Sequence, residues 1–155
     1  MKIFDKTTMA VTTGAATLAL GLTLLAPAQQ ANATGIWRIQ SPTTGKCVQW
    51  NGYGKNITLV KCAKKYAQYW GFEGTQLVNI SNEYAGWCLD VPKKAERAPV
   101  GRACAHANAI MANDKRVGHK TYMAGDGKYL KTVNGKIVCG KRTADKKKMQ
   151  WKLIA

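Results

Sequence analysis

The sequence predicts an all-β domain of about twelve short strands with threefold internal symmetry, built from three repeats of roughly 41 residues each. The first observation is a recurring motif, GKCV at 45–48, GWCL at 86–89 and GKYL at 127–130. Cys47, Cys88 and Tyr129 are equally spaced along the chain, since 88 − 47 = 41 and 129 − 88 = 41. The second observation is that apolar residues do not recur with a helical period, whereas short runs alternate with turn sequences. A fixed period of this length is typical of a fold with internal symmetry.

The strands are expected where β-branched or apolar runs lie between turn signals. In the first repeat, PTTG at 42–45 and NGYG at 51–54 are such turns, and Asn134-Gly135 predicts a tight hairpin in the third. Residues 103–112 are rich in alanine and could form a helical turn. The expected strands are residues 36–40, 46–50, 57–61 and 70–73, then 76–80, 87–91 and 99–103, then 120–123, 128–133, 135–139 and 150–154.

Residues 1–33 have the three parts of a secretory signal peptide. Lys2 and Lys6 form a basic start, residues 17–28 form an apolar core, and Ala31-Asn32-Ala33 is a small-x-small cleavage site. A membrane anchor is disfavoured because the apolar run is short and is interrupted by Thr and Gly. The expected mature domain is residues 34–155. Removing the leader changes the formal charge from 24 − 8 = +16 to 22 − 7 = +15.

The five cysteines agree with export, because disulfides persist outside the cell. Separations of 15 and 16 residues suggest two local bridges, Cys47–Cys62 and Cys88–Cys104. Cys139 is left over, and we place it at the second-cysteine position of the third repeat, where Tyr129 replaces the first cysteine. It is expected to be either a buried thiol or one half of an intermolecular bridge. No Cys-x-x-Cys pair or other metal-ligand spacing occurs.

The repeats resemble the ricin B-chain lectin family. The shared marks are a Cys near the start of a repeat, a second Cys midway, and Gln-x-Trp near the end. That last mark is QYW at 68–70 in the first repeat and a contracted QW at 150–151 in the third. The resemblance covers residues 37–153 and implies a β-trefoil fold. It also implies that Trp70 and Trp151 belong to the shared core, where each indole N–H needs a hydrogen-bond partner.

The resemblance also implies where a sugar would bind. The family's site needs an Asp two residues after the first Cys, an aromatic platform before the second Cys, and an Asn beside Gln-x-Trp. Asp90 matches the first requirement, although it could instead stabilise a turn. Its platform position holds Arg102, so Trp87 or His106 would have to supply a ring. These four residues are the candidate ligand-binding residues. The other repeats depart at both positions, with Gln49 and Val60 in the first and Lys131 and Ile137 in the third.

Charge suggests the kind of ligand, since 22 basic residues face seven acidic ones after the leader. We expect a secreted, non-catalytic module that binds carbohydrate or an anionic cell-surface polymer and favours anionic glycans. Nucleic acid would bind only non-specifically, and no cofactor or metal is expected. A toxin's cell-binding subunit and a trefoil protease inhibitor are alternatives. A ribonuclease using His106, His119 and Lys120 lacks a supporting constellation, so no catalytic residue is assigned. The basic clusters are 61–65, 93–94, 115–116, 141–142 and 146–148.

Overall fold

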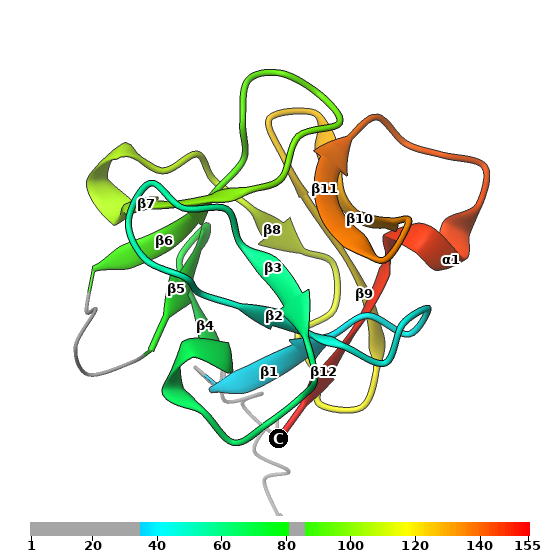
Figure 1. Ribbon diagram of the computed structural model, residues 1–155, viewed down its shortest axis with the longest axis horizontal. Coiled ribbons are helices and arrows are strands. Elements are labelled where there is room, and N and C mark those ends of the chain that lie inside the picture. The colour runs from blue at the N-terminus through cyan, green and yellow to red at the C-terminus, as the bar shows by residue number, and fades with distance from the viewer. Residues whose placement is uncertain (1–34, 81–85) are drawn as a thin grey trace, which may run out of the picture. The chain divides into compact units, whose positions relative to one another are not determined.

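A computed structural model describes residues 35–80 and 86–155, and the predicted signal peptide lies outside this range (Figure 1). Within the described part, the chain forms twelve strands, four in each repeat, as the repeat pattern predicts. The first repeat contains β1 (Trp37–Gln40), β2 (Cys47–Gln49), β3 (Thr58–Val60) and β4 (Tyr69–Glu73). The second contains β5 (Gln76–Asn79), β6 (Trp87–Asp90), β7 (Val100–Ala103) and β8 (Met111–Ala112). The third contains β9 (Lys120–Gly125), β10 (Lys128–Val133), β11 (Lys136–Gly140) and β12 (Gln150–Ile154).

The strands fall into two groups that repeat three times. The first and last strands of the repeats pair with one another, in the order β8-β9-β12-β1-β4-β5. A backbone bond from Ile110 to the Thr75 carbonyl brings the approach to β8 beside the start of β5. The middle strands form the three hairpins β2–β3, β6–β7 and β10–β11. Each repeat therefore supplies two strands to a curled sheet and one hairpin to its rim.

Two buried tryptophans mark the internal symmetry of the core. The Trp70 indole N–H donates to the Val48 carbonyl at 3.0 Å, and the Trp151 indole N–H donates to the Leu130 carbonyl at 2.8 Å. Both rings are fully buried. The two bonds join equivalent strands of the first and third repeats, so backbone carbonyls supply the hydrogen-bond partners that these buried indoles need.

Each repeat contains a short helical turn before its last strand. The helical turn predicted within residues 103–112 is present as a 3-10 turn, η2 (Cys104–His106), and the rest of this segment leads into β8, which pairs with β9. The turns η1 (Tyr66–Gln68) and α1 (Lys146–Met149) were not predicted, and Asp145 caps α1 by accepting from the Lys147 N–H.

Both predicted disulfides, Cys47–Cys62 and Cys88–Cys104, are present. In both of these hairpins, the first cysteine pairs across the strands with a residue that lies two positions before the second cysteine. Cys47 pairs across the hairpin with Val60, and Cys88 with Arg102.

The same register corrects the position predicted for Cys139. Tyr129 pairs with Gly140, so the residue equivalent to a second cysteine is Arg142, two positions further on. The reason is turn length. The third hairpin turns through two residues, 134–135, whereas eight and nine residues connect the strands in the other two. Cys139 instead points into the core, where it is fully buried as a free thiol.

Candidate functional site

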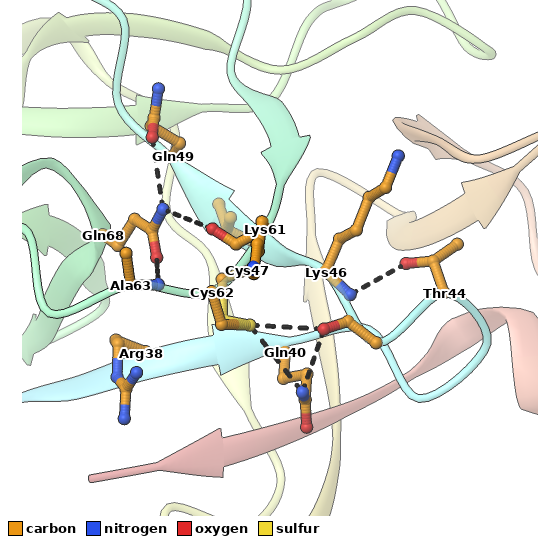
Figure 2. The surroundings of a disulfide bond; sticks show 12 residues. Arg38, Gln40, Thr44, Lys46, Cys47, Gln49, Lys61, Cys62, Ala63 and Gln68 are labelled. Carbon is orange, nitrogen blue, oxygen red and sulfur yellow. Dashed lines mark hydrogen bonds between the residues drawn. A yellow bond between two sulfur atoms is a disulfide. The ribbon is translucent and has the colours of Figure 1, made fainter.

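In the first repeat, the residue at the position of the family's sugar-binding Asp is Gln49, and it is hydrogen-bonded to other side-chain amides. Gln49, at the position where the family has Asp, accepts a hydrogen bond from Gln68 at 3.2 Å and donates to Asn51 at 3.1 Å. Gln68 is buried and also donates to the Lys61 carbonyl, while its own carbonyl accepts from the Ala63 N–H (Figure 2). This network ties the hairpin to the chain after the disulfide. The Gln of Gln-x-Trp therefore has a structural role in this repeat.

The second repeat brings together three polar side chains at the corresponding place. The Asp90 carboxylate is almost buried, with 5% of its side chain exposed. Its Oδ1 accepts from the Asn108 backbone N–H at 2.8 Å, and its Oδ2 lies 3.1 Å from Nε of Arg102. Asn108 in turn donates from its amide to the Val91 carbonyl at 2.8 Å. Asp90 is thus held in place by a hydrogen bond to one carboxylate oxygen and an ion pair with the other.

This geometry changes what the carboxylate can offer to a ligand. A carboxylate has about four lone-pair sites, and two of those on Asp90 are used by Asn108 and Arg102. The Arg102 side chain is 49% exposed, and Asp90 engages it through Nε. Among the described residues, the two terminal nitrogens of the guanidinium form no ion pair, so they can bind an external acceptor. The pair presents an oriented cation where the family has an aromatic platform.

Trp87, one of the two predicted aromatic partners of Asp90, lies on the other face of its strand. Side chains alternate faces along a strand, so Trp87, three residues before Asp90 on β6, points to the opposite face. There its ring contacts Tyr53, at a centroid distance of 5.1 Å, and Trp50, at 6.2 Å. Tyr53 is 63% exposed. His106 is exposed at the end of η2, two residues before Asn108.

A glycine makes room for this aromatic cluster. A Cβ on Gly101 would collide with the Trp50 ring and would lie 2.6 Å from the Gly52 carbonyl oxygen. The loop carrying Tyr53 is fixed on β7 by backbone bonds, because the Gly54 N–H donates to the Gly101 carbonyl and the Gly101 N–H donates to the Lys55 carbonyl. The first repeat thereby covers one face of the second repeat's hairpin.

In the third repeat, a basic residue stands at the position of the family's sugar-binding Asp. Lys131, which replaces Asp, is nearly buried and its Nζ lies 2.6 Å from the Glu96 carboxylate. The strand register also corrects the residue at the platform position, which lies two residues before the second-cysteine position. This residue is Gly140, two residues before Arg142, and not the predicted Ile137, which is a core residue. A Cβ on Gly140 would collide with the Glu96 carboxylate, so the glycine leaves the space that this ion pair occupies.

Asn108 and Glu96 are the site residues that were not predicted from the sequence. Asn108 and Ile110 follow Gln68 and Trp70 by nearly one full repeat, so they take the place of Gln-x-Trp in the second repeat. The repeat period alone could have located them. Glu96 lies in the loop between β6 and β7, 35 residues from Lys131, and no motif links the two.

Most cations of the domain have no acidic partner. Residues 35–80 and 86–155 contain 22 Lys and Arg residues and six Asp and Glu residues. Five of those cations form ion pairs with acidic side chains in the described part, which leaves 17 that do not. The basic side chains of the clusters found in the sequence are all exposed.

The pKa values of Asp114 and Cys139 are shifted by the surroundings of each side chain. Asp114 pairs with the Arg116 guanidinium at 2.8 Å and with His119 at 3.3 Å, and the hydrogen bonds from Arg116 hold the pKa of that carboxyl well below its usual range. Burial raises the pKa of the Cys139 thiol to about 12, so it is protonated at neutral pH.

Within residues 35–80 and 86–155, no three His, Cys, Asp or Glu side chains come together as metal ligands would. None of the helices in the same ranges is long and apolar enough to cross a membrane.

Comparison with known proteins identifies the same fold as the strand order and hairpins described above. A family model described as a ricin-type beta-trefoil lectin domain matches residues 35–151. A designed threefold symmetric protein, ThreeFoil, aligns with a TM-score of 0.62 and 15% identity, over 77% of this chain and 98% of that one. A ricin B-like lectin of Macrolepiota procera, solved with lactose, aligns with a TM-score of 0.60 and 16% identity, over 81% and 98%.

A longer protein also contains this fold. A mosquitocidal holotoxin aligns with a TM-score of 0.62 and 14% identity, over 79% of this chain and 17% of the toxin. At these identities the structural matches establish the fold, and they confirm the predicted β-trefoil. A search of curated protein sequences gave no match.

Proposed function

Because the chain belongs to the ricin-type β-trefoil lectin family, we propose that it is a secreted, non-catalytic carbohydrate-binding module that favours anionic glycans. Export is supported by the leader-like N-terminal sequence and by the two disulfides. The proposed domain is residues 34–155, after removal of residues 1–33. Its partners are glycans or other anionic polymers of a cell surface.

The ion pair between Asp90 and Arg102 is the observation that carries the preference for anions. In this family's pattern the carboxylate accepts sugar hydroxyls beside an aromatic ring. Here the carboxylate is partly occupied by a guanidinium that is half exposed. A guanidinium binds sulfate or carboxylate groups through two parallel hydrogen bonds. A sugar that carries such a group is therefore a better ligand for this hairpin than a neutral one.

The unpaired cations support the same conclusion at longer range. Seventeen basic side chains without an acidic partner in the described residues create a positive potential, which raises the rate of encounter with polyanions. Exposed charges are screened by salt over about 10 Å at 0.1 M ionic strength. Binding to anionic glycans should therefore weaken as salt is added, whereas stacking on a neutral sugar would not.

A glycan array read at low and high salt tests the proposal. Sulfated or uronate-containing glycans should give the strongest signals, and these should fall with salt. Arg102→Gln should weaken binding to them about tenfold, the effect of one charge-assisted hydrogen bond. Arg97→Gln is the matched control, because Arg97 is also exposed in the second repeat and its side chain lacks an ion pair among the described residues. Salt-resistant binding to neutral sugars that Arg102→Gln leaves unchanged would refute the preference for anions.

A second candidate function is the cell-binding subunit of a toxin. The match to part of a mosquitocidal holotoxin favours it, because there the same fold forms a small part of a longer chain. In this case a second protein should co-purify with the domain from the native culture medium. Elution of the native protein at the size of the domain alone would exclude this function.

A further inference from the structure

A pocket of about 600 Å³ lies between β8, at the end of the second repeat, and the third repeat. Lys131 and Ile137, which depart from the family's sugar site in the third repeat, do not line it. The residues that line it lie on β8, β9, β10 and α1 and in the segments that follow β8 and β11. Figure 1 shows where these strands and the helix run. The volume is within the range of pockets that bind small ligands. Tyr129 and Arg142 both line it.

These two residues stand where the other repeats have a disulfide. The register places Tyr129 at the first-cysteine position and Arg142 at the second. A neighbouring contact agrees: in the first repeat the N–H after Cys62 donates to the Gln68 side chain, and in the third the N–H after Arg142 donates to the Met149 sulfur. Without the covalent bridge, the two segments enclose a pocket lined by both side chains.

The aromatic walls of the pocket are fixed in position. The Tyr122 hydroxyl accepts a hydrogen bond from Gln150 at 3.0 Å, which holds its ring. Tyr129 is half-buried on the neighbouring strand β10. Met149 is buried at the end of α1. Rings and a thioether held in this way provide an apolar surface on which the C–H face of a sugar can pack.

The polar groups of the pocket are mainly donors. Asn113 uses its carbonyl oxygen to accept from the Tyr122 N–H and the Thr121 hydroxyl. Its amide N–H groups donate to no described residue and can donate to a ligand. Arg142 and Lys146 are exposed and form no ion pair with any described residue. Asp145, the acidic residue nearest to them in sequence, is engaged by Lys148 and by the Lys147 N–H.

We propose that this pocket binds a sulfated or carboxylated sugar residue, with Arg142 and Lys146 on the anionic group and the two tyrosine rings against the sugar. The choice of a glycan as the ligand rests on the proposed function. The pocket itself is independent of the Asp90–Arg102 pair, because neither of these two residues lines it. The protein would then have two anion-binding places, one on the second hairpin and one in the third repeat.

The test titrates the purified protein with a sulfated, uronate-containing tetrasaccharide and with its desulfated counterpart, by calorimetry and by NMR. Arg142→Gln should weaken binding to the sulfated compound about tenfold, because it removes one charge-assisted interaction. Lys141→Gln is the matched control. It makes the same change of charge on an exposed neighbour that does not line the pocket, and it should alter affinity less than about twofold. The ring signals of Tyr122 and Tyr129 should shift during the titration.

Each of the other outcomes would refute the pocket, the choice of a sugar as its ligand, or the proposed function. If the tetrasaccharide binds, Arg102→Gln weakens it, and Arg142→Gln and the tyrosine signals do not respond, the pocket is excluded and the proposed function stands. If Arg142→Gln and Lys141→Gln weaken binding equally, the effect is general charge and the pocket is again excluded. If sodium sulfate at the same concentration produces the same tyrosine shifts, the ligand is a bare anion and not a sugar. If the protein binds neither compound, the proposed function fails together with the pocket.

Discussion

Restoring the missing disulfide of the third repeat is the sharpest test of its hairpin register. The change is Tyr129→Cys combined with Arg142→Cys. In the two native bridges the Cα atoms lie 4.9 Å apart, and the pair 129 and 142 occupies the same register. This separation is within the range that disulfides need. The bridge should therefore form during oxidative folding, while Cys139 stays buried and free.

The size of the effect follows from the length of the closed loop. A bridge between 129 and 142 closes a loop of about 14 residues, for which the chain-entropy model gives about 3 kcal/mol. The reference is the Tyr129→Ser, Arg142→Ser variant, which loses the same side chains without the bridge. For a domain of this size the Cys pair should melt about 10 °C above the Ser pair.

Two measurements decide the outcome. Peptide mass mapping without reduction should find residues 129 and 142 linked and a single free thiol, and urea unfolding should give the difference in stability between the Cys and Ser pairs. The bridged variant should also lose the binding assigned to the pocket, since the bridge closes it. Three free thiols in the folded double variant would show that Tyr129 and Arg142 are not at equivalent positions.

Three other predictions concern the core. Trp70→Phe and Trp151→Phe should each cost about 2–3 kcal/mol in urea unfolding, because each leaves a buried carbonyl without its indole donor; very different costs would contradict their equivalence. Gly101→Ala should destabilise the domain by about 1–3 kcal/mol, since the new methyl group collides with the Trp50 ring, and unchanged urea midpoints would refute that contact. Cys139 should react with a thiol reagent only after unfolding. Its folded pKa of about 12 lies above the unfolded value of 9.0, so its contribution to stability is complete below pH 9 and is lost as the pH rises toward 12. The wild type should therefore lose more stability over that range than Cys139→Ala, and equal losses would contradict it.

Sequence reasoning was reliable where the signal was local or periodic. The two disulfides follow from cysteines 15 and 16 residues apart, and the strands follow from short runs between turns. It failed in the third hairpin, where a shorter turn changed which residues of the two strands pair with each other. The two-residue turn at 134–135 shortens the third hairpin, so counting along the chain placed Cys139 and Ile137 at positions that Arg142 and Gly140 occupy. Within alanine-rich residues 103–112 the helical turn is present at Cys104–His106, as predicted, but β8 at the end of this segment was not predicted, because it depends on pairing with β9.

The sequence by itself determined the threefold repeat, the family resemblance, the two bridges and the excess of positive charge. Each of these depends on residue identity and spacing, which the chain carries before it folds. The tertiary structure alone decided which side chains meet. Asp90 is bonded to Arg102 across a hairpin, Lys131 meets Glu96 from another repeat, and Trp87 faces away from Asp90. Such contacts depend on strand register and on loops from different repeats, which local pattern does not encode.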